Sequence, residues 1–125
     1  MAASAGFTIS ITLAEAQPVW NGPAPIDGFE PGHTYYGVHV AVASKMGPGL
    51  EAAVSRVKAM GVGELGRGWI YSDLACDQGA SQQLGVPTDW SSAAVYFYTR
   101  ADAEAFAASH DTAAGIARVK TYCAD

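Results

Sequence analysis

The hydrophobic pattern constrains the fold most, because it repeats one order of elements, strand, helix, strand, in two halves of the chain. Apolar residues at every second position predict a strand, and recurrence at every third or fourth position predicts a helix. The expected strands are 35–43, 68–72, 92–98 and 116–123, and the expected helices are 50–60 and 99–110. Thr99 with Asp102 three residues later is close to a capping box and marks the start of the second helix. This βαββαβ order predicts an α+β domain with a ferredoxin-like antiparallel sheet.

A further strand is expected at the N-terminus, where Phe7, Ile9, Ile11 and Leu13 alternate with Thr and Ser. We expect it to add to a sheet edge, since its alternation calls for one buried face. A connector rich in Pro and Gly follows, from residue 17 to residue 33, and is long enough to lie over the mouth of a pocket. The expected organisation is therefore 1–34 as strand and connector, and 35–125 as the ferredoxin-like domain.

Composition excludes several classes of protein. The chain has 125 residues, which fits one domain, and 50% of them are hydrophobic, which argues against disorder. Its net charge is −5 and it has no basic stretch, so neither nucleic acid nor an anionic membrane surface is an expected partner. No apolar run approaches the roughly 18 residues that span a bilayer.

The compartment is expected to be cytoplasmic, because the first basic residue is Lys45 and a secretory signal needs an earlier positive charge. A signal removed beforehand would leave secretion open. Cys76 and Cys123 can form one disulfide or stay free, and the missing signal favours free thiols.

The sheet is expected to have one face under both helices and one face without a cover. Val38, Val40 and Val42 define the helix side of the first strand, as Val95 and Phe97 do on the third. The opposite face then carries the chemistry-bearing and small residues, namely Gly37, His39, Ala41, Ala94, Tyr96 and Tyr98. An uncovered face with aromatic groups predicts a homodimer formed through it, with room for a small-molecule ligand.

Histidine and tyrosine are the candidate functional side chains. His39 and His110 are acid/base candidates, since imidazole titrates near neutral pH, although each also has a structural interpretation. Tyr96 and Tyr98 are candidates for orienting a ligand oxygen, and Trp69 and Tyr71 of the second strand for binding the ligand. Asp73 and Asp77 flank Cys76 but have no histidine at ligand spacing, so no metal site is indicated, and no cofactor is expected.

The run Asp89-Trp90-Ser91-Ser92-Ala93-Ala94-Val95-Tyr96-Phe97-Tyr98-Thr99-Arg100-Ala101-Asp102-Ala103-Glu104-Ala105-Phe106, followed by His110, resembles the second half of dimeric α+β barrel proteins of the Dabb, EthD-like and antibiotic-biosynthesis-monooxygenase families. Gly37-Val38-His39-Val40 resembles their first strand. The resemblance implies a homodimeric barrel around a small-molecule cavity and an enzyme that acts without a cofactor, as a cyclase, dehydratase or monooxygenase on an aromatic or polyketide-like ligand. His110 and Tyr96 are the nearest matches to the acid/base pair of Dabb cyclases, but Asp111-Thr112-Ala113 follow where a second histidine is typical.

A different class of function is also open. The same order of elements, with Ser72-Asp73 after the second strand and Tyr98-Thr99-Arg100-Ala101-Asp102-Ala103-Glu104-Ala105 opening the second helix, is similar to SPOR domains. That resemblance implies a secreted peptidoglycan-binding module without catalysis. A structural oligomer with an empty pocket is the third alternative.

Overall fold

The computed structural model describes residues 19–28, 30–62, 71–109 and 115–122. Its helices and strands are β1 (Thr34–Ala43), α2 (Pro48–Ala59), β2 (Tyr71–Asp73), η2 (Leu74–Cys76), β3 (Asp77–Gln78), α4 (Ala80–Leu84), β4 (Ser91–Phe97), α5 (Arg100–Ala107) and β5 (Gly115–Thr121). The N-terminal strand expected at residues 7–13 lies outside the described residues. No helix of the described part is long and apolar enough to cross a membrane.

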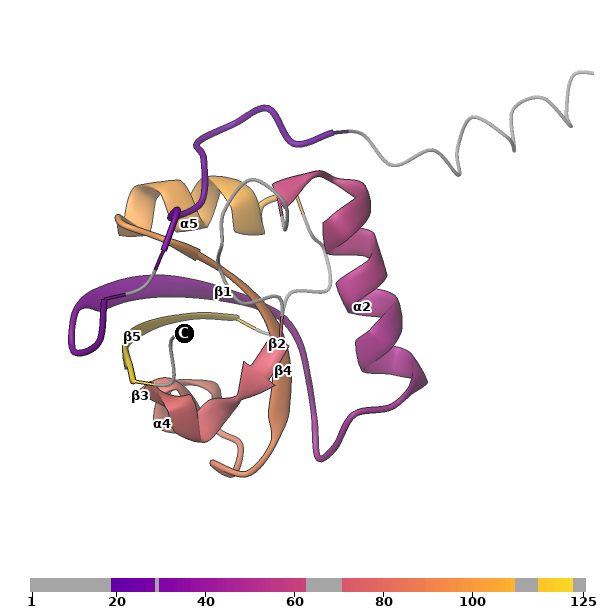
Figure 1. The fold of residues 1–125 in the computed structure, drawn as a ribbon, viewed down its shortest axis with the longest axis vertical. Coiled ribbons are helices and arrows are strands. Elements are labelled where there is room, and N and C mark those ends of the chain that lie inside the picture. Colours follow the sequence, from indigo (N-terminus) through magenta and orange to yellow (C-terminus); the bar gives the residue numbers. More distant parts are fainter. Residues whose placement is uncertain (1–18, 29, 63–70, 110–114, 123–125) are drawn as a thin grey trace, which may run out of the picture.

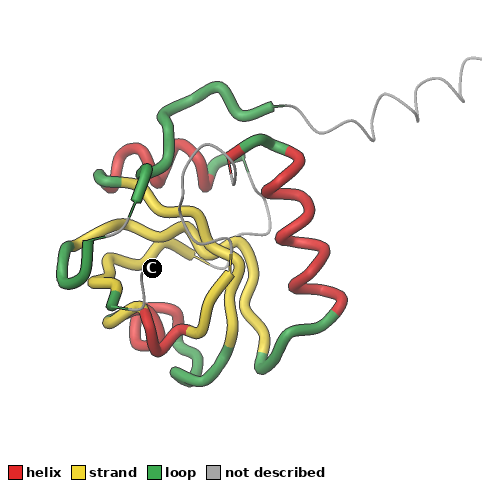
Figure 2. The backbone as a smooth tube through the Cα atoms, in the orientation of Figure 1, coloured by secondary structure: helices red, strands yellow, loops and turns green. Residues whose placement is uncertain are grey.

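The strands form one antiparallel sheet in the order β2-β4-β1-β5-β3. β1 is the middle strand, with β4 and β5 on either side of it, and Figure 2 shows the sheet curling between the helices. The fold is α+β and is compatible with a ferredoxin-like architecture.

The sheet curls because its two edges belong to one short segment. β2 and β3 lie at opposite edges, yet only the three residues of η2 separate them in sequence. In a flat sheet of five strands those edges would be about 19 Å apart, whereas three residues of 3-10 helix advance only about 6 Å. The segment 71–78 therefore draws the edges together, and the sheet acquires an inner face and an outer face (Figure 1).

The outer face packs against α2 and α5. Its fully buried members come from both halves of the chain and include Val38, Leu50, Val57, Phe97 and Phe106. α5 begins where the sequence predicts, because the Thr99 hydroxyl accepts a hydrogen bond of 3.1 Å from the Asp102 amide. The predicted helix side of the sheet is confirmed for Val38, Val40, Val95 and Phe97.

A β-bulge corrects the predicted faces of β1. His39 pairs with Ala94 and Ala41 pairs with Ala93, so two residues of β1 oppose one step of β4. The extra residue reverses the alternation beyond it. Ala41 and Ala43 therefore pack on the helix side and Val42 packs on the inner side, opposite to the prediction.

The inner face was expected to be uncovered, and this is wrong. Its core contains Ala94, Tyr96, Ala117 and Val119 from the sheet, covered by Leu74 of η2, Ala80 of α4 and Ile26 of the connector. The loop expected between the second and third strands thus contains η2, β3 and α4, and it supplies this cover from within the chain. The homodimer stays a prediction, but its stated reason, a bare sheet face, is absent.

The described part of the connector is held against the domain by two residues. The Trp20 amide donates to the Met60 carbonyl at 2.9 Å, and the Trp20 ring meets Phe106 edge to face, with centroids 5.1 Å apart. The Ile26 amide donates to the Tyr96 carbonyl at 2.9 Å, and its side chain is fully buried. The connector is therefore part of the packed structure at these two points.

Replacing Trp20 by Ala should lower the free energy of unfolding by about 2 kcal/mol, because it removes a half-buried ring from the outer core. Urea denaturation measures this change. Val19→Ala is the matched control, since Val19 is 70% exposed and its truncation should be nearly neutral. Equal stabilities for the two variants would mean that Trp20 does not anchor the connector to the fold.

The expectation of free thiols is also wrong, because Cys76 is disulfide-bonded. The second cysteine of the sequence, Cys123, lies outside the described residues. Cys76 ends η2 immediately before β3, and its carbonyl accepts a hydrogen bond of 3.0 Å from the Tyr122 amide. This part of the chain is therefore tied to the C-terminal strand beside Asp77.

Candidate functional site

A carboxyl group in the inner core is the most unusual polar feature of the described residues. Asp77 opens the two-residue strand β3, opposite Thr121 of β5, and it is only 3% exposed. The hydroxyl of Tyr96, which is fully buried, donates a hydrogen bond to Asp77 Oδ2. β3 thus carries a carboxylate into the core, and β4 supplies the phenol that holds it.

Burial gives this carboxyl a proton affinity suited to acid/base chemistry. Loss of hydration raises the pKa of Asp77 from 3.8 to about 6, and the hydrogen bond from Tyr96 lowers it only in part. A group with a pKa near ambient pH populates both its acidic and its basic form, as a proton-transfer group requires.

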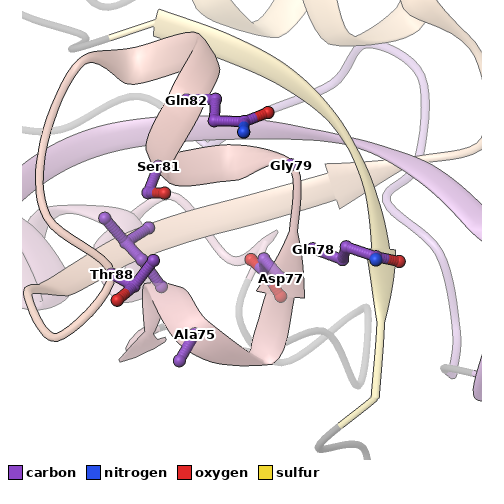
Figure 3. Close-up of a pocket in the computed structure, with 8 residues that line it drawn as sticks. Ala75, Asp77, Gln78, Gly79, Ser81, Gln82 and Thr88 are labelled. Atoms are coloured by element: carbon purple, nitrogen blue, oxygen red, sulfur yellow. The ribbon is translucent and has the colours of Figure 1, made fainter.

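The Asp77 carboxyl lines a hollow of about 420 Å³ between η2, β3, α4 and the loop that follows α4 (Figure 3). Leu74 and Ala75 supply apolar side chains to its lining, and the polar side chains other than Asp77 are uncharged, namely Gln78, Ser81, Gln82 and Thr88. Tyr96 is the only hydrogen-bond partner that the described structure gives the Asp77 carboxyl, and it uses Oδ2. Oδ1 is therefore the oxygen available to a molecule in the hollow.

The position of the hollow depends on α4, which a glutamine attaches to the sheet edge. The Gln83 side chain donates to the Arg118 carbonyl at 2.8 Å and accepts from the Arg118 amide at 2.8 Å. These two bonds complete the β5 edge where a strand would otherwise pair. α4 therefore stays beside β3, with Ser81 and Gln82 at the hollow.

His39 lies in the same inner layer but has no partner. It is fully buried, neither ring nitrogen has a hydrogen bond, and its ring meets Tyr96 edge to face with centroids 6.2 Å apart. Burial lowers the pKa of His39 to about 4. The imidazole is thus neutral near pH 7 and a weak base.

Gly37 allows these two rings to pack together. A Cβ at Gly37 would lie 2.9 Å from Tyr96 Cε2 and 3.1 Å from His39 Nε2. Both contacts are closer than real Cβ atoms normally show. The two rings therefore occupy the space beside Gly37, and no ligand can enter it. The space expected around Gly37 is therefore occupied.

The structure does not place the other predicted site residues at the Asp77 hollow. Tyr98 is 56% exposed beyond the end of β4, where its hydroxyl donates to Asp27 at 3.1 Å. It lines a separate hollow of about 330 Å³ with Asp27, Glu30, His33 and Tyr35. His110 and Trp69 lie outside the described residues, and Tyr71 is described only as part of the β2 backbone.

The sequence pattern does not mark Asp77 as functional, because no histidine lies at ligand spacing from Asp73, Cys76 or Asp77. Its importance comes from Tyr96, 19 positions away, and from burial by α4. An acidic residue directly after a cysteine was the only local signal.

Within the described residues, no group of three or more His, Cys, Asp or Glu side chains is placed to hold a metal ion. No protein-family model, curated protein or solved structure matches the chain.

Proposed function

We propose that this domain binds a small molecule in the hollow at Asp77 and exchanges a proton with it, with Tyr96 holding the carboxyl in place. The observation that carries the proposal is a carboxyl only 3% exposed, bonded to a buried phenol through Oδ2, in a residue that lines a 420 Å³ hollow. Such a hollow is large enough for a small ligand.

The roles of the two residues follow from this geometry. Asp77, with its pKa of about 6, gives up or accepts the proton at Oδ1. Tyr96 fixes the orientation of the carboxyl through Oδ2 and favours its ionised form. Positioned general acid/base catalysis of this kind contributes about 10² to 10⁴ in rate. The cofactor-free chemistry expected from the sequence is thus transferred in this proposal from His39 and His110 to Asp77.

We expect the Asp77 carboxyl to titrate near pH 6 and its pKa to rise further in Tyr96→Phe, because the phenol hydrogen bond favours the charged form. Carboxyl-carbon NMR measures both values. A Tyr36→Phe variant is the matched control, since Tyr36 packs against the helix-side core. An Asp77 pKa that falls or stays constant in Tyr96→Phe would contradict the role given to Tyr96.

Binding is tested by screening small-molecule fragments against the amide NMR signals of the protein. Ligands should shift the signals of residues 78–82, and the shifts should be lost or weakened in Asp77→Asn. Glu51→Gln is the charge-matched control, because Glu51 is exposed on α2 behind the sheet. Proton exchange further requires that a bound ligand move the pKa of Asp77. If no fragment shifts the amide signals of residues 78–82, the proposal is wrong.

The disulfide at Cys76 favours a second candidate, an exported module of the SPOR-like type that binds glycan strands. Disulfides persist mainly in oxidising compartments outside the cytosol. Retention of the protein by denuded peptidoglycan strands, unchanged by Asp77→Asn, would favour this module over the proton-exchange site.

A further inference from the structure

We infer that the ligand of the Asp77 hollow is a small organic cation, bound through an ammonium N–H group to Asp77 Oδ1. This rests on the proposed function and specifies the chemistry of its ligand. A small amine is the class that the walls of the hollow fit best, for three reasons taken in turn.

The first reason is the buried charge itself. A carboxylate that has lost most of its hydration is costly unless an opposite charge or several donors compensate it. Tyr96 supplies one neutral donor to Oδ2, and the described structure provides no cation to Oδ1. A ligand ammonium would supply both a donor and the opposite charge at the open oxygen.

The second reason is the lining. Gln78, Ser81, Gln82 and Thr88 offer amide and hydroxyl oxygens, which accept hydrogen bonds from the remaining N–H groups of an ammonium. None of the described lining residues is basic, so nothing there would hold a ligand carboxylate or phosphate.

The third reason is the long-range field. The protein carries a net charge of −5, and the only charged side chain among the described lining residues is acidic. This field attracts cations toward the hollow and repels anions. An anionic ligand would therefore meet repulsion both at a distance and at the carboxylate.

The test compares amines with alcohols of the same shape. Benzylamine is paired with benzyl alcohol, and glucosamine with glucose, and each probe is titrated into the whole protein near neutral pH while the amide signals of Gln78, Ser81 and Gln82 are followed. We expect at least one amine to bind about 10- to 100-fold more tightly than its alcohol, which is the usual gain of a charge-assisted hydrogen bond. Asp77→Asn should abolish this ratio, and Glu51→Gln should keep it.

Equal binding of amine and alcohol, or a ratio that survives in Asp77→Asn, would overturn the inference while leaving the hollow as a small-molecule site. Failure of both amines to shift these signals would also overturn it. The ratio is measured on the unmodified protein, so the result does not depend on the stability of the variant. The proposed function fails separately, if fragments of every charge leave the hollow unperturbed.

Discussion

Removing His39 or Asp77 should change the pH dependence of stability in opposite directions. In the unfolded chain His39 takes up a proton near its ordinary pKa of 6.5, but in the fold its pKa is about 4. Between pH 4 and 6.5 the unfolded state therefore binds more protons at this residue, so the contribution of His39 to the free energy of unfolding rises with pH. The full change is about 3 kcal/mol, because one pKa unit corresponds to about 1.4 kcal/mol.

Asp77 acts with the opposite sign. Its pKa rises from 3.8 to about 6 on folding, so the folded state holds the proton through this interval. The contribution of Asp77 therefore falls as the pH rises from about 4 to 6, also by about 3 kcal/mol. In the unmodified protein these two contributions largely cancel.

Urea denaturation at several pH values between 4 and 6.5 should reveal how the free energy of unfolding changes with pH in each variant. Relative to the unmodified protein, Asp77→Asn should gain stability with rising pH and His39→Leu should lose it. The double variant should restore the original slope. His39→Leu should be at least as stable as the unmodified protein at pH 7, because it removes two buried nitrogens without partners. Parallel curves for all four proteins would show that neither group is buried as described.

Replacing Gly37 by Ala should lower the free energy of unfolding by about 2–3 kcal/mol, and the melting temperature by about 10 °C. The added Cβ would lie 2.9 Å from a ring carbon of Tyr96 and 3.1 Å from His39 Nε2. Both rings are fully buried, so neither can move into solvent. The strain must then be taken up by the sheet or by the Asp77–Tyr96 hydrogen bond.

Gly49→Ala is the matched control for this substitution. Gly49 lies in the first turn of α2, and a Cβ there meets nothing within 4 Å. Because Ala favours helix over Gly, this variant should gain up to about 1 kcal/mol. Thermal unfolding followed by circular dichroism compares the two variants directly. A Gly37→Ala variant as stable as Gly49→Ala would contradict the close packing of the His39 and Tyr96 rings.

Several features could be predicted from the sequence because they depend on local patterns. The alternation around Val38 and Val95 indicated both central strands and their helix side, and Thr99 with Asp102 marked the start of α5. The same alternation placed His39 and Tyr96 on one face, and their rings do meet there. Side-chain direction in a strand follows from position alone as long as the alternation is unbroken.

The bulge and the inner cover could not be predicted in this way. The bulge after His39 interrupts the alternation without any sign in the sequence, since Val38, Val40 and Val42 continue the pattern of an unbroken strand. α4 has five residues between Gly79 and Gly85, which is too short for a helical period to be recognised. The sequence therefore indicated a loop and a bare face where the structure has a cover.

The sequence alone determined the two strand-helix-strand halves and their order, because hydrophobic periodicity is a property of neighbours along the chain. It also determined the helix side of the sheet at Val38, Val40, Val95 and Phe97. Only the tertiary structure decided which polar group could have a function. Asp77 lies in the inner layer because η2 joins the two sheet edges, and the Tyr96 side chain of β4 reaches its carboxyl although β4 and β3 are not neighbours in the sheet. Its raised pKa arises from lost hydration in the folded chain, which no local sequence pattern encodes.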